Sequence, residues 1–237
     1  MMISNDTARA FEQIAQRQRD LQAAFSSGGF AVHGDVAREP SVRVALDPLS
    51  VAAPANAYFV TEDGRVRTFS RNGDFRIESG RLVDGSGRSV LGLRHDGASF
   101  APLEVEPVDV ALGRAQDARI GSDGTLSYAW RVIDPRSGNV EMQRVAVGRI
   151  ALARFPAGTK LAPADATHGV ADAALAHYGV PQDGNFGPLA AFRREDSRVD
   201  VDAGLERLEE AYLAFDALRA AHQAQGTTQK AAMDLVK

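Results

Sequence analysis

Five histidines are the side chains in this sequence best suited to metal binding or to acid–base chemistry. None of them stands in the H-x-H or H-E-x-x-H spacing that places two imidazoles on one metal ion. The chain has no cysteine, which excludes thiolate catalysis, disulfides and cysteine-bound metal. We therefore expect no metal and no cofactor. The five are His33, His95, His168, His177 and His222.

The carboxylates and the candidate nucleophile also lie in patterns typical of structure rather than catalysis. Asp84, Asp96 and Asp123 each precede a glycine, and aspartates in such turns usually accept hydrogen bonds from the local backbone. Ser86 lies between two glycines without the G-x-S-x-G elbow of a hydrolase. The charge-balanced run 193–196, Arg-Arg-Glu-Asp, is interpreted as a solvated surface. We expect no catalytic residue and no enzyme activity.

One enzyme hypothesis stays open, with a site in the proline-containing segment 156–200. Asp165, His168 and His177 lie there, and connections of this length usually carry function or disorder. The hypothesis needs an ordered pocket in which polar groups converge. Segment length is its only support.

Composition narrows the classes of partner. The 237 residues are 44% hydrophobic and 24% charged, and the net charge of -4 predicts no nucleic-acid surface. The most apolar stretch, VAAPANAYFV, is interrupted by Pro54 and Asn56 and is too short to span a bilayer, so we expect no membrane insertion. The first twenty residues lack the pattern of a cleavable signal peptide.

An amphipathic helix is predicted within residues 1–29. Apolar side chains with 3-4-3-4 spacing, in which Gln18 fills one polar position, form a heptad seam typical of coiled coils. The run Ser-Ser-Gly-Gly at 26–29 ends the pattern. The seam residues are Phe11, Ile14, Leu21 and Phe25.

A β domain is predicted for residues 57–155. Short runs rich in β-branched and aromatic residues alternate there with turn dipeptides such as Asp63-Gly64. Within it, Asn72 and Gly73 separate VRTFSR from DFRIES, which predicts a hairpin with a type I′ turn. Residues 30–56 are interpreted as an extended connection with at most one strand. Residues 156–200 are interpreted as a long loop connection with a short helical candidate at 170–178.

A second amphipathic helix is predicted for residues 201–237, where 3-4-3 spacing returns. Its seam consists of Leu205, Leu208, Tyr212 and Phe215, and Leu213 and Leu218 widen it. The expected fold is a mainly β central domain flanked by N- and C-terminal amphipathic α-helices, α+β overall. Helices with one apolar face need a partner. That partner is the β domain, the other helix, or further copies of the chain.

Several stretches resemble bacterial flagellar rod and hook proteins. Residues 68–75, 80–84 and 87–92 are similar, in that order, to the family's "TR-dG-sF … dG-LV-t-dG-vLG" motif. Residues 120–125 are similar to its DG-t segment, and 148–155 to its "G-kI-la-F" segment. Ser197 to Asp200 resembles the opening of its C-terminal helix, with Arg198 in place of asparagine. The asparagine-rich motif after the first helix and the usual wording of the C-terminal helix are absent, so the chain resembles a rod-type member that diverges at both termini.

The resemblance implies a structural role in motility. It implies a subunit of the flagellar basal-body rod, whose terminal helices pack with neighbouring subunits in a helical tubular assembly. Its partners would be other rod or hook subunits and copies of itself, in the rod that spans the periplasm. Export through the flagellum's own channel fits the expected lack of a cleavable signal peptide. The alternative is a monomeric accessory or chaperone-like module with both helices folded on the β domain.

Overall fold

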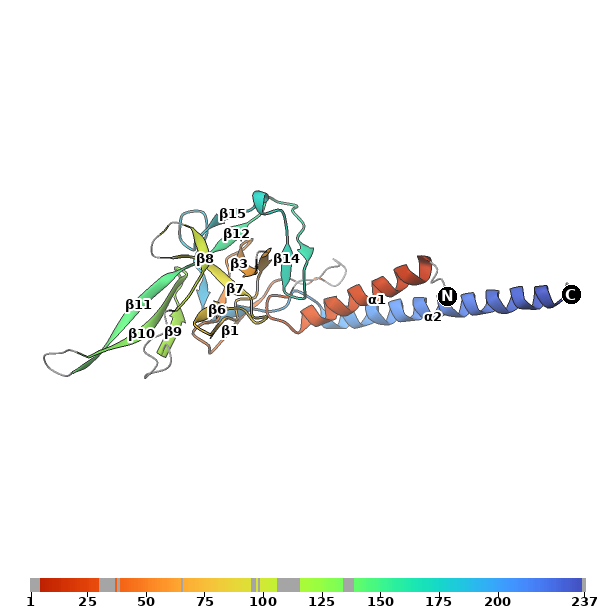
Figure 1. Ribbon diagram of the computed structural model, residues 1–237, viewed down its shortest axis with the longest axis horizontal. Helices are drawn as coiled ribbons and strands as arrows, with labels where there is room; N and C mark the ends of the chain where they lie inside the picture. Colours follow the sequence, from red (N-terminus) through yellow and green to blue (C-terminus); the bar gives the residue numbers. More distant parts are fainter. Residues whose placement is uncertain are drawn as a thin grey trace.

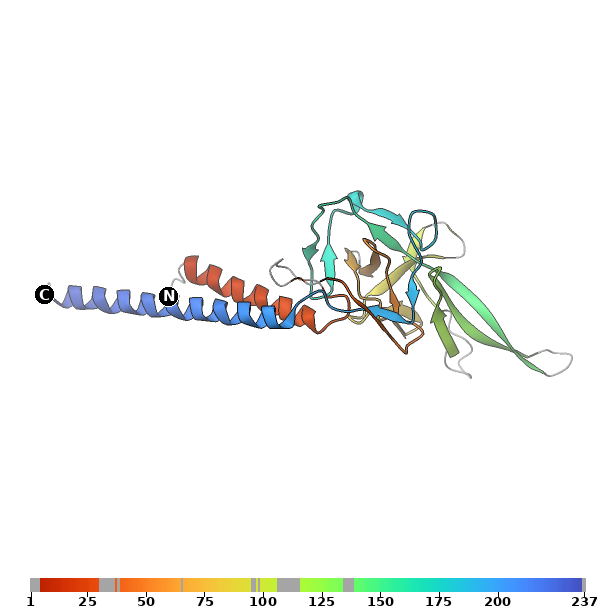
Figure 2. The ribbon, with the colours of Figure 1, turned by 180° about the vertical axis from the view of Figure 1, so that it is seen from behind.

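The chain forms a β body from which two helices project together on one side (Figure 1). Seen from behind, the same helices leave the body as a single stalk, and a two-stranded arm extends from the other side (Figure 2). This computed structural model describes residues 5–29, 37, 39–64, 66–94, 97, 99–105, 116–133 and 139–235.

The two helices are α1, Asn5–Ala24, and α2, Val201–Leu235. Helix α1 ends where Ser26 N–H bonds the carbonyl of Ala23 at 3.1 Å and Gly28 adopts a φ of 63°. Left-handed backbone of this kind commonly follows a helix C-terminus, and glycine adopts it without strain. Helix α2 begins after Asp200, whose carboxylate accepts the N–H of Ala203 at 3.1 Å as an N-cap.

The main sheet has 13 strands, and all of its pairings are antiparallel. Its longest path runs through β13 (Ala162–Pro163), β14 (His168–Val170), β4 (Val66–Ser70), β3 (Tyr58–Asp63), β7 (Ser89–Arg94), β11 (Val140–Ile150), β10 (Thr125–Ile133) and β9 (Gln116–Ile120). Off this path lie β5 (Arg76–Glu78), β6 (Arg81–Val83), β8 (Phe100–Pro102), β12 (Leu152–Arg154) and β15 (His177–Gly179).

Among the described residues, two small sheets and one short helix accompany the main sheet. Strand β1 (Val42–Val44) pairs with β17 (Arg193–Glu195), and β2 (Val51–Ala52) pairs with β16 (Ala190–Ala191). The single turn of 3-10 helix, η2, spans Ala173–Leu175. Strands β10 and β11 form the arm, which points away from the helices (Figure 1).

Both faces of the central strands are buried. Phe59 and Val90 point into a large cluster with Leu82, Leu126 and Ile150. Their chain neighbours Val60 and Leu91 belong to a second, smaller cluster. Because successive strand residues point to opposite faces, the sheet separates two hydrophobic cores.

The expectation of an α+β protein is wrong, because the chain is mainly β. Its 13-stranded sheet curls into half a barrel, and two helices flank it at the expected ends of the chain. In α2 the apolar side chains are spread around the helix rather than gathered on one face. Strands β1, β2 and β13 to β17 fall within the segments interpreted as connections. They are two or three residues long, too short to show an alternating pattern.

The predicted type I′ turn at Asn72-Gly73 is also wrong. Neither residue has a positive φ, and β4 and β5, the strands on either side, do not pair with each other. The hairpin lies instead at Ser79-Gly80, where φ is 50° and 78° and Glu78 pairs with Arg81. A Cβ on Gly73 would lie 1.8 Å from the carbonyl oxygen of Val51. Close backbone approach therefore explains this glycine.

Two other predicted turns do form. The turn at Asp63-Gly64 is confirmed, because Asp63 pairs with Val66 and Gly64 has a φ of 65°. Asp123-Gly124 also forms a turn, in which Gly124 N–H bonds the carbonyl of Gly121 at 2.9 Å. Asp96, another aspartate predicted to lie in a turn, is outside the described residues.

The two explanations of Gly73 predict different outcomes for Gly73→Asn. Asparagine tolerates left-handed backbone, so a type I′ turn would accept it. Close packing against Val51 instead predicts a loss of about 1–3 kcal/mol or more in the free energy of unfolding. Gly64→Asn is the matched control, because φ there is 65° and a Cβ at this position would have no neighbouring atom within 4 Å. This variant should lose less than about 1 kcal/mol in the free energy of unfolding. Chemical denaturation measures both, and equal small losses would contradict close packing at Gly73.

Candidate assembly interface

Helices α1 and α2, together called the stalk, pack against each other in antiparallel orientation (Figure 1). The rings of Phe11 and Phe215 have centroids 6.5 Å apart. Gln18 Nε2 donates to the hydroxyl oxygen of Tyr212 at 2.9 Å. Nearer the body, a Cβ on Gly204 would lie 2.9 Å from Leu21 Cδ2, so this glycine allows close helix contact.

The sequence-predicted seam is divided between an inner and an outer side of the stalk. Ile14 is buried, and the inner side also holds the half-buried residues Leu21, Leu208, Phe215 and Leu218. The outer side, defined here by exposure, keeps large apolar side chains in solvent, and two of them, Phe11 and Tyr212, lie at its margin, where they also contact the opposite helix. The outer residues are Phe11, 65% exposed, Phe25, 79%, Leu205, 53%, Tyr212, 44%, and Leu213, 64%.

The two helices differ in length. At 1.5 Å per residue the 20 residues of α1 span about 30 Å and the 35 residues of α2 about 52 Å. Helix α2 therefore runs on past the first described turn of α1 (Figure 1). Its residues 219–228 are all exposed.

A buried ion pair joins the stalk to the sheet. Arg71, directly after β4, donates from Nε to Glu195 Oε2 at 2.8 Å, and neither side chain is more than 5% exposed. Its other nitrogens donate to the carbonyls of Pro54 at 2.8 Å, Ala53 at 3.1 Å and Ala57. A guanidinium offers five N–H donors, and these contacts use most of them.

Glu195 receives contacts from both helix ends. Arg198, just before α2, donates from Nε to Glu195 Oε1 at 2.6 Å. Gly28, just after α1, donates its N–H to the carbonyl of Glu195 at 2.9 Å. The interpretation of run 193–196 as a solvated surface is wrong for Glu195, which is fully buried. Its partner Arg71 is 124 residues away, so no local charge pattern could indicate the pair.

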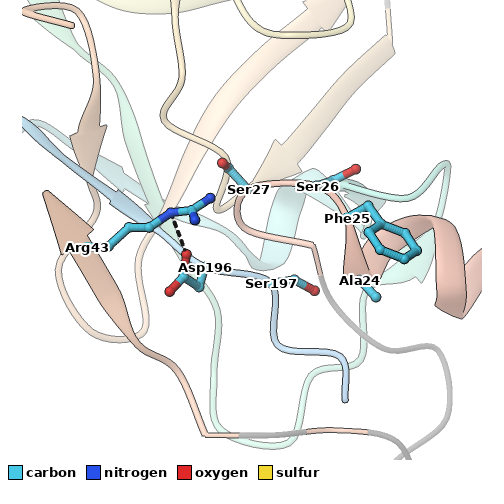
Figure 3. Close-up of a pocket in the computed structure, with 7 residues that line it drawn as sticks. All are labelled: Ala24, Phe25, Ser26, Ser27, Arg43, Asp196 and Ser197. Atoms are coloured by element: carbon cyan, nitrogen blue, oxygen red, sulfur yellow. Dashed lines mark ion pairs between the residues drawn. The ribbon is translucent and has the colours of Figure 1, made fainter. Parts of the chain in front are cut away.

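A polar pocket lies beside this junction (Figure 3). Arg43 and Asp196 form an ion pair in it, with Nε and Oδ1 2.8 Å apart. Ser41 also donates to Asp196 Oδ2 at 3.2 Å. No histidine is among the lining residues, and the main polar contact across the pocket is the surface ion pair. The lining residues are Ala24, Phe25, Ser26, Ser27, Arg43, Asp196 and Ser197.

The three residues of the enzyme hypothesis do not form a reactive group in a pocket. Asp165 and His168 come together, but His168 is fully buried and both of its ring nitrogens contact carboxylates. His177 does not join them; its ring stacks on that of Phe186, with ring centroids 6.2 Å apart. Within the described ranges, no three His, Cys, Asp or Glu side chains are grouped so that they could hold a metal ion.

Comparison with protein-family models and with curated proteins found no match to this chain. No helix among the described residues is both long enough and apolar enough to cross a membrane.

The buried junction predicts a large effect of Arg71→Met. Removing one partner leaves the Glu195 carboxylate buried with only Arg198 as its cation, and losses of this kind are about 3–5 kcal/mol. The exposed pair Arg81–Glu104, with Nε and Oε1 3.0 Å apart, is the matched control. Arg81→Met should lose no more than about 1 kcal/mol. Chemical denaturation of both variants measures the difference, and similar small losses would refute the structural importance of the junction.

Proposed function

We propose that this chain is a structural subunit of the bacterial flagellar basal-body rod. Its stalk packs with the stalks of neighbouring subunits in a helical tubular assembly, and its partners are copies of itself and other rod or hook subunits. In this proposal the chain reaches the periplasm-spanning rod through the flagellum's own export channel. The observation that carries the proposal is a projecting stalk whose outer side keeps large apolar side chains in solvent.

The amount of exposed apolar surface favours contact with several neighbours. Full burial of one large apolar side chain contributes about 1.5–3 kcal/mol. The five outer residues are roughly half to four-fifths exposed, so covering all of them is worth on the order of 5–9 kcal/mol. Association alone costs an estimated 4–15 kcal/mol. A single stalk contact is therefore close to break-even, whereas a lattice in which every stalk touches several others gains at each contact.

The resemblance to rod and hook proteins supports the proposal from a second direction. Arg71 of the similar segment 68–75 forms the ion pair at the stalk base. Gly73 of the same segment allows close backbone contact with Val51. Arg71 thereby holds the body and stalk in one geometry, as a subunit repeated along a filament requires.

The alternative, a monomeric module with both helices folded on the β domain, has less support. The helices pack on each other and leave the body (Figure 1 and Figure 2). Large side chains on the outer side consequently gain nothing from the sheet. A sizing experiment over a range of protein concentrations distinguishes this alternative, because only an assembling chain shifts to larger species.

Charged substitutions on the outer side test the proposal. Leu205→Asp and Leu213→Asp should sharply reduce incorporation into the rod, because each places a charge in a surface that becomes desolvated. They should leave the melting temperature of the isolated chain nearly unchanged, since both side chains are more than half exposed. The measurement is the amount of this chain in basal bodies purified from cells that carry each variant.

Two controls accompany this experiment. Val66→Asp, at a 58% exposed site on the β body, should enter the rod normally. Leu208→Asp, on the inner side, should disturb the packing of α1 on α2 in the isolated chain. Wild-type incorporation of Leu205→Asp and Leu213→Asp would reject the stalk as an assembly surface. Intact rods in images of basal bodies from cells lacking the chain would reject the rod assignment itself.

A further inference from the structure

Residues 155–176, here called the strap, connect two strands of the main sheet that pair with each other. They follow β12 and precede β15, and these two strands pair with Arg154 opposite His177. The strap carries β13, β14 and η2 along the edge of the body (Figure 1). Because its two ends are held together, the strap can open as a unit without breaking the rest of the sheet.

The strap covers the second hydrophobic cluster. Phe155, at its start, packs edge-on against the buried Phe69 with ring centroids 4.8 Å apart. Leu161, Ala171 and Ala176 pack on the same cluster and are only partly buried. Opening of the strap would expose Phe69 and the edge of β4, to which β14 is paired.

A buried histidine fastens the middle of the strap to the body. His168 Nε2 lies 2.7 Å from Asp84 Oδ2, and Nδ1 lies 2.9 Å from Asp165 Oδ1. His168 and Asp84 are both completely buried. Ser70 of β4 adds a hydrogen bond from its hydroxyl to the carbonyl of Thr167 at 2.7 Å.

The charges around His168 come from three segments. Asp84 and Arg88 both lie in the connection between β6 and β7, and Asp165 lies between β13 and β14, where it pairs with Arg88. Asp63 at the end of β3 lies 4.0 Å from Arg88 and completes the set. Two uncharged residues also lie at this site. Ser70 of β4 bonds the carbonyl of Thr167, and the hydroxyl of Thr167 lies 2.9 Å from His168 Nδ1.

The charged imidazolium suits this arrangement better than the neutral ring. It donates to a carboxylate from both ring nitrogens. A neutral ring that donates to Asp84 could accept at Nδ1 only from the Thr167 hydroxyl, 2.9 Å away, and would turn the same lone pair toward the Asp165 carboxylate. Burial lowers the pKa of His168, but the hydrogen bonds and charges of Asp165 and Asp84 outweigh it and raise the pKa above its ordinary value. Burial raises the pKa of Asp84 and of Asp165, yet the contacts from His168 and local N–H groups lower both overall.

We propose that Asp84, His168 and Asp165 form a proton-operated latch that keeps the strap closed while His168 is charged. When His168 loses its proton, the strap opens and uncovers Phe69 and the edge of β4. This conformational device does not depend on the proposed rod function.

The direction of the pH dependence follows from which state holds the proton more tightly. The closed strap keeps the His168 proton to a higher pH than the open strap, where the ring has its ordinary pKa of 6.5. The equilibrium constant for strap opening should therefore be lowest below pH 6.5 and rise by about tenfold per pH unit above it. It should level off once the pH passes the raised pKa of His168. On the acid side, the latch weakens as pH falls below 3.8 toward the lowered pKa values of Asp84 and Asp165.

Proteolysis at Lys160 measures strap opening directly in the full chain. The sequence has only three lysines, Lys160, Lys230 and Lys237, and Lys160 is the one within the strap. A lysine-specific endoprotease should cut there only when the strap opens, because cleavage requires locally unfolded backbone. The rate of appearance of fragment 1–160 is measured from pH 6 to 9 and divided by the rate for an unstructured peptide with the same Thr-Lys-Leu sequence.

The expected result is a normalised rate that rises several-fold to tenfold per pH unit above pH 6.5. His168→Gln cannot titrate, so it should be cut faster than the wild type at pH 6 and show no pH dependence. His177→Gln is the matched control at the base of the strap, where the ring is exposed, and it should keep the wild-type profile. A flat wild-type rate from pH 6 to 9 would overturn the proposal.

Two further measurements keep the proposal testable if His168→Gln does not fold. Nitrogen-15 NMR of the wild-type protein at pH 6.5 should show the His168 ring mostly as the charged imidazolium, because a ring with the ordinary pKa of 6.5 would be half charged there, and a ring that is half charged or less would overturn the latch. The free energy of global unfolding is measured over the same pH range. A Lys160 cleavage rate that simply follows global unfolding would also overturn the proposal, because the strap would then not open by itself.

Discussion

The buried pair of Arg71 and Glu195 is the interaction on which the arrangement of this molecule depends. Arg71 belongs to the sheet, and Glu195 lies in β17 just before α2. The arginine also holds the carbonyls of Ala53, Pro54 and Ala57, so the segment leading into β3 is fixed by the same side chain. A charge in this position is stable only while all of its partners are present. Body, stalk base and β3 are consequently fixed together.

This junction determines what the stalk can do. Gly28 and Arg198 bring the end of α1 and the start of α2 to the same glutamate, so the helices leave the body side by side. Their contact buries Ile14 and closes around Gly204, while Phe25 and Leu213 stay outside. A stalk that folded onto the sheet would cover those side chains within the chain. A stalk held away from the sheet leaves them for other molecules, which is why assembly is the function that this geometry favours.

The sequence allowed accurate prediction where the physical cause is local. Helical periodicity with the Ser-Ser-Gly-Gly stop placed the first helix, and Asp63-Gly64 marked a real hairpin. Prediction failed where the cause is distant. The strands at 162–195 are too short for periodicity and form because other strands of the body pair with them. Gly73 resembles a turn glycine, but its reason is the carbonyl of Val51. The seam spacing identified apolar positions on the helices without indicating which of them would face the partner helix.

Asp84 shows why a residue can be predicted correctly, as a turn aspartate, and still be incompletely understood. Oδ1 of Asp84 accepts the N–H groups of Ser86 and Arg88, as an aspartate before glycine is expected to do, and Oδ2 is thereby aimed at His168. Asp165 repeats this arrangement from the other side, because its Oδ1 accepts the N–H of His168 while Oδ2 pairs with Arg88. Each turn thus orients its own carboxylate through hydrogen bonds to neighbouring residues. The imidazolium can bridge the two carboxylates only where the sheet brings the two turns together, so the latch depends on local turn geometry and on strand pairing at once.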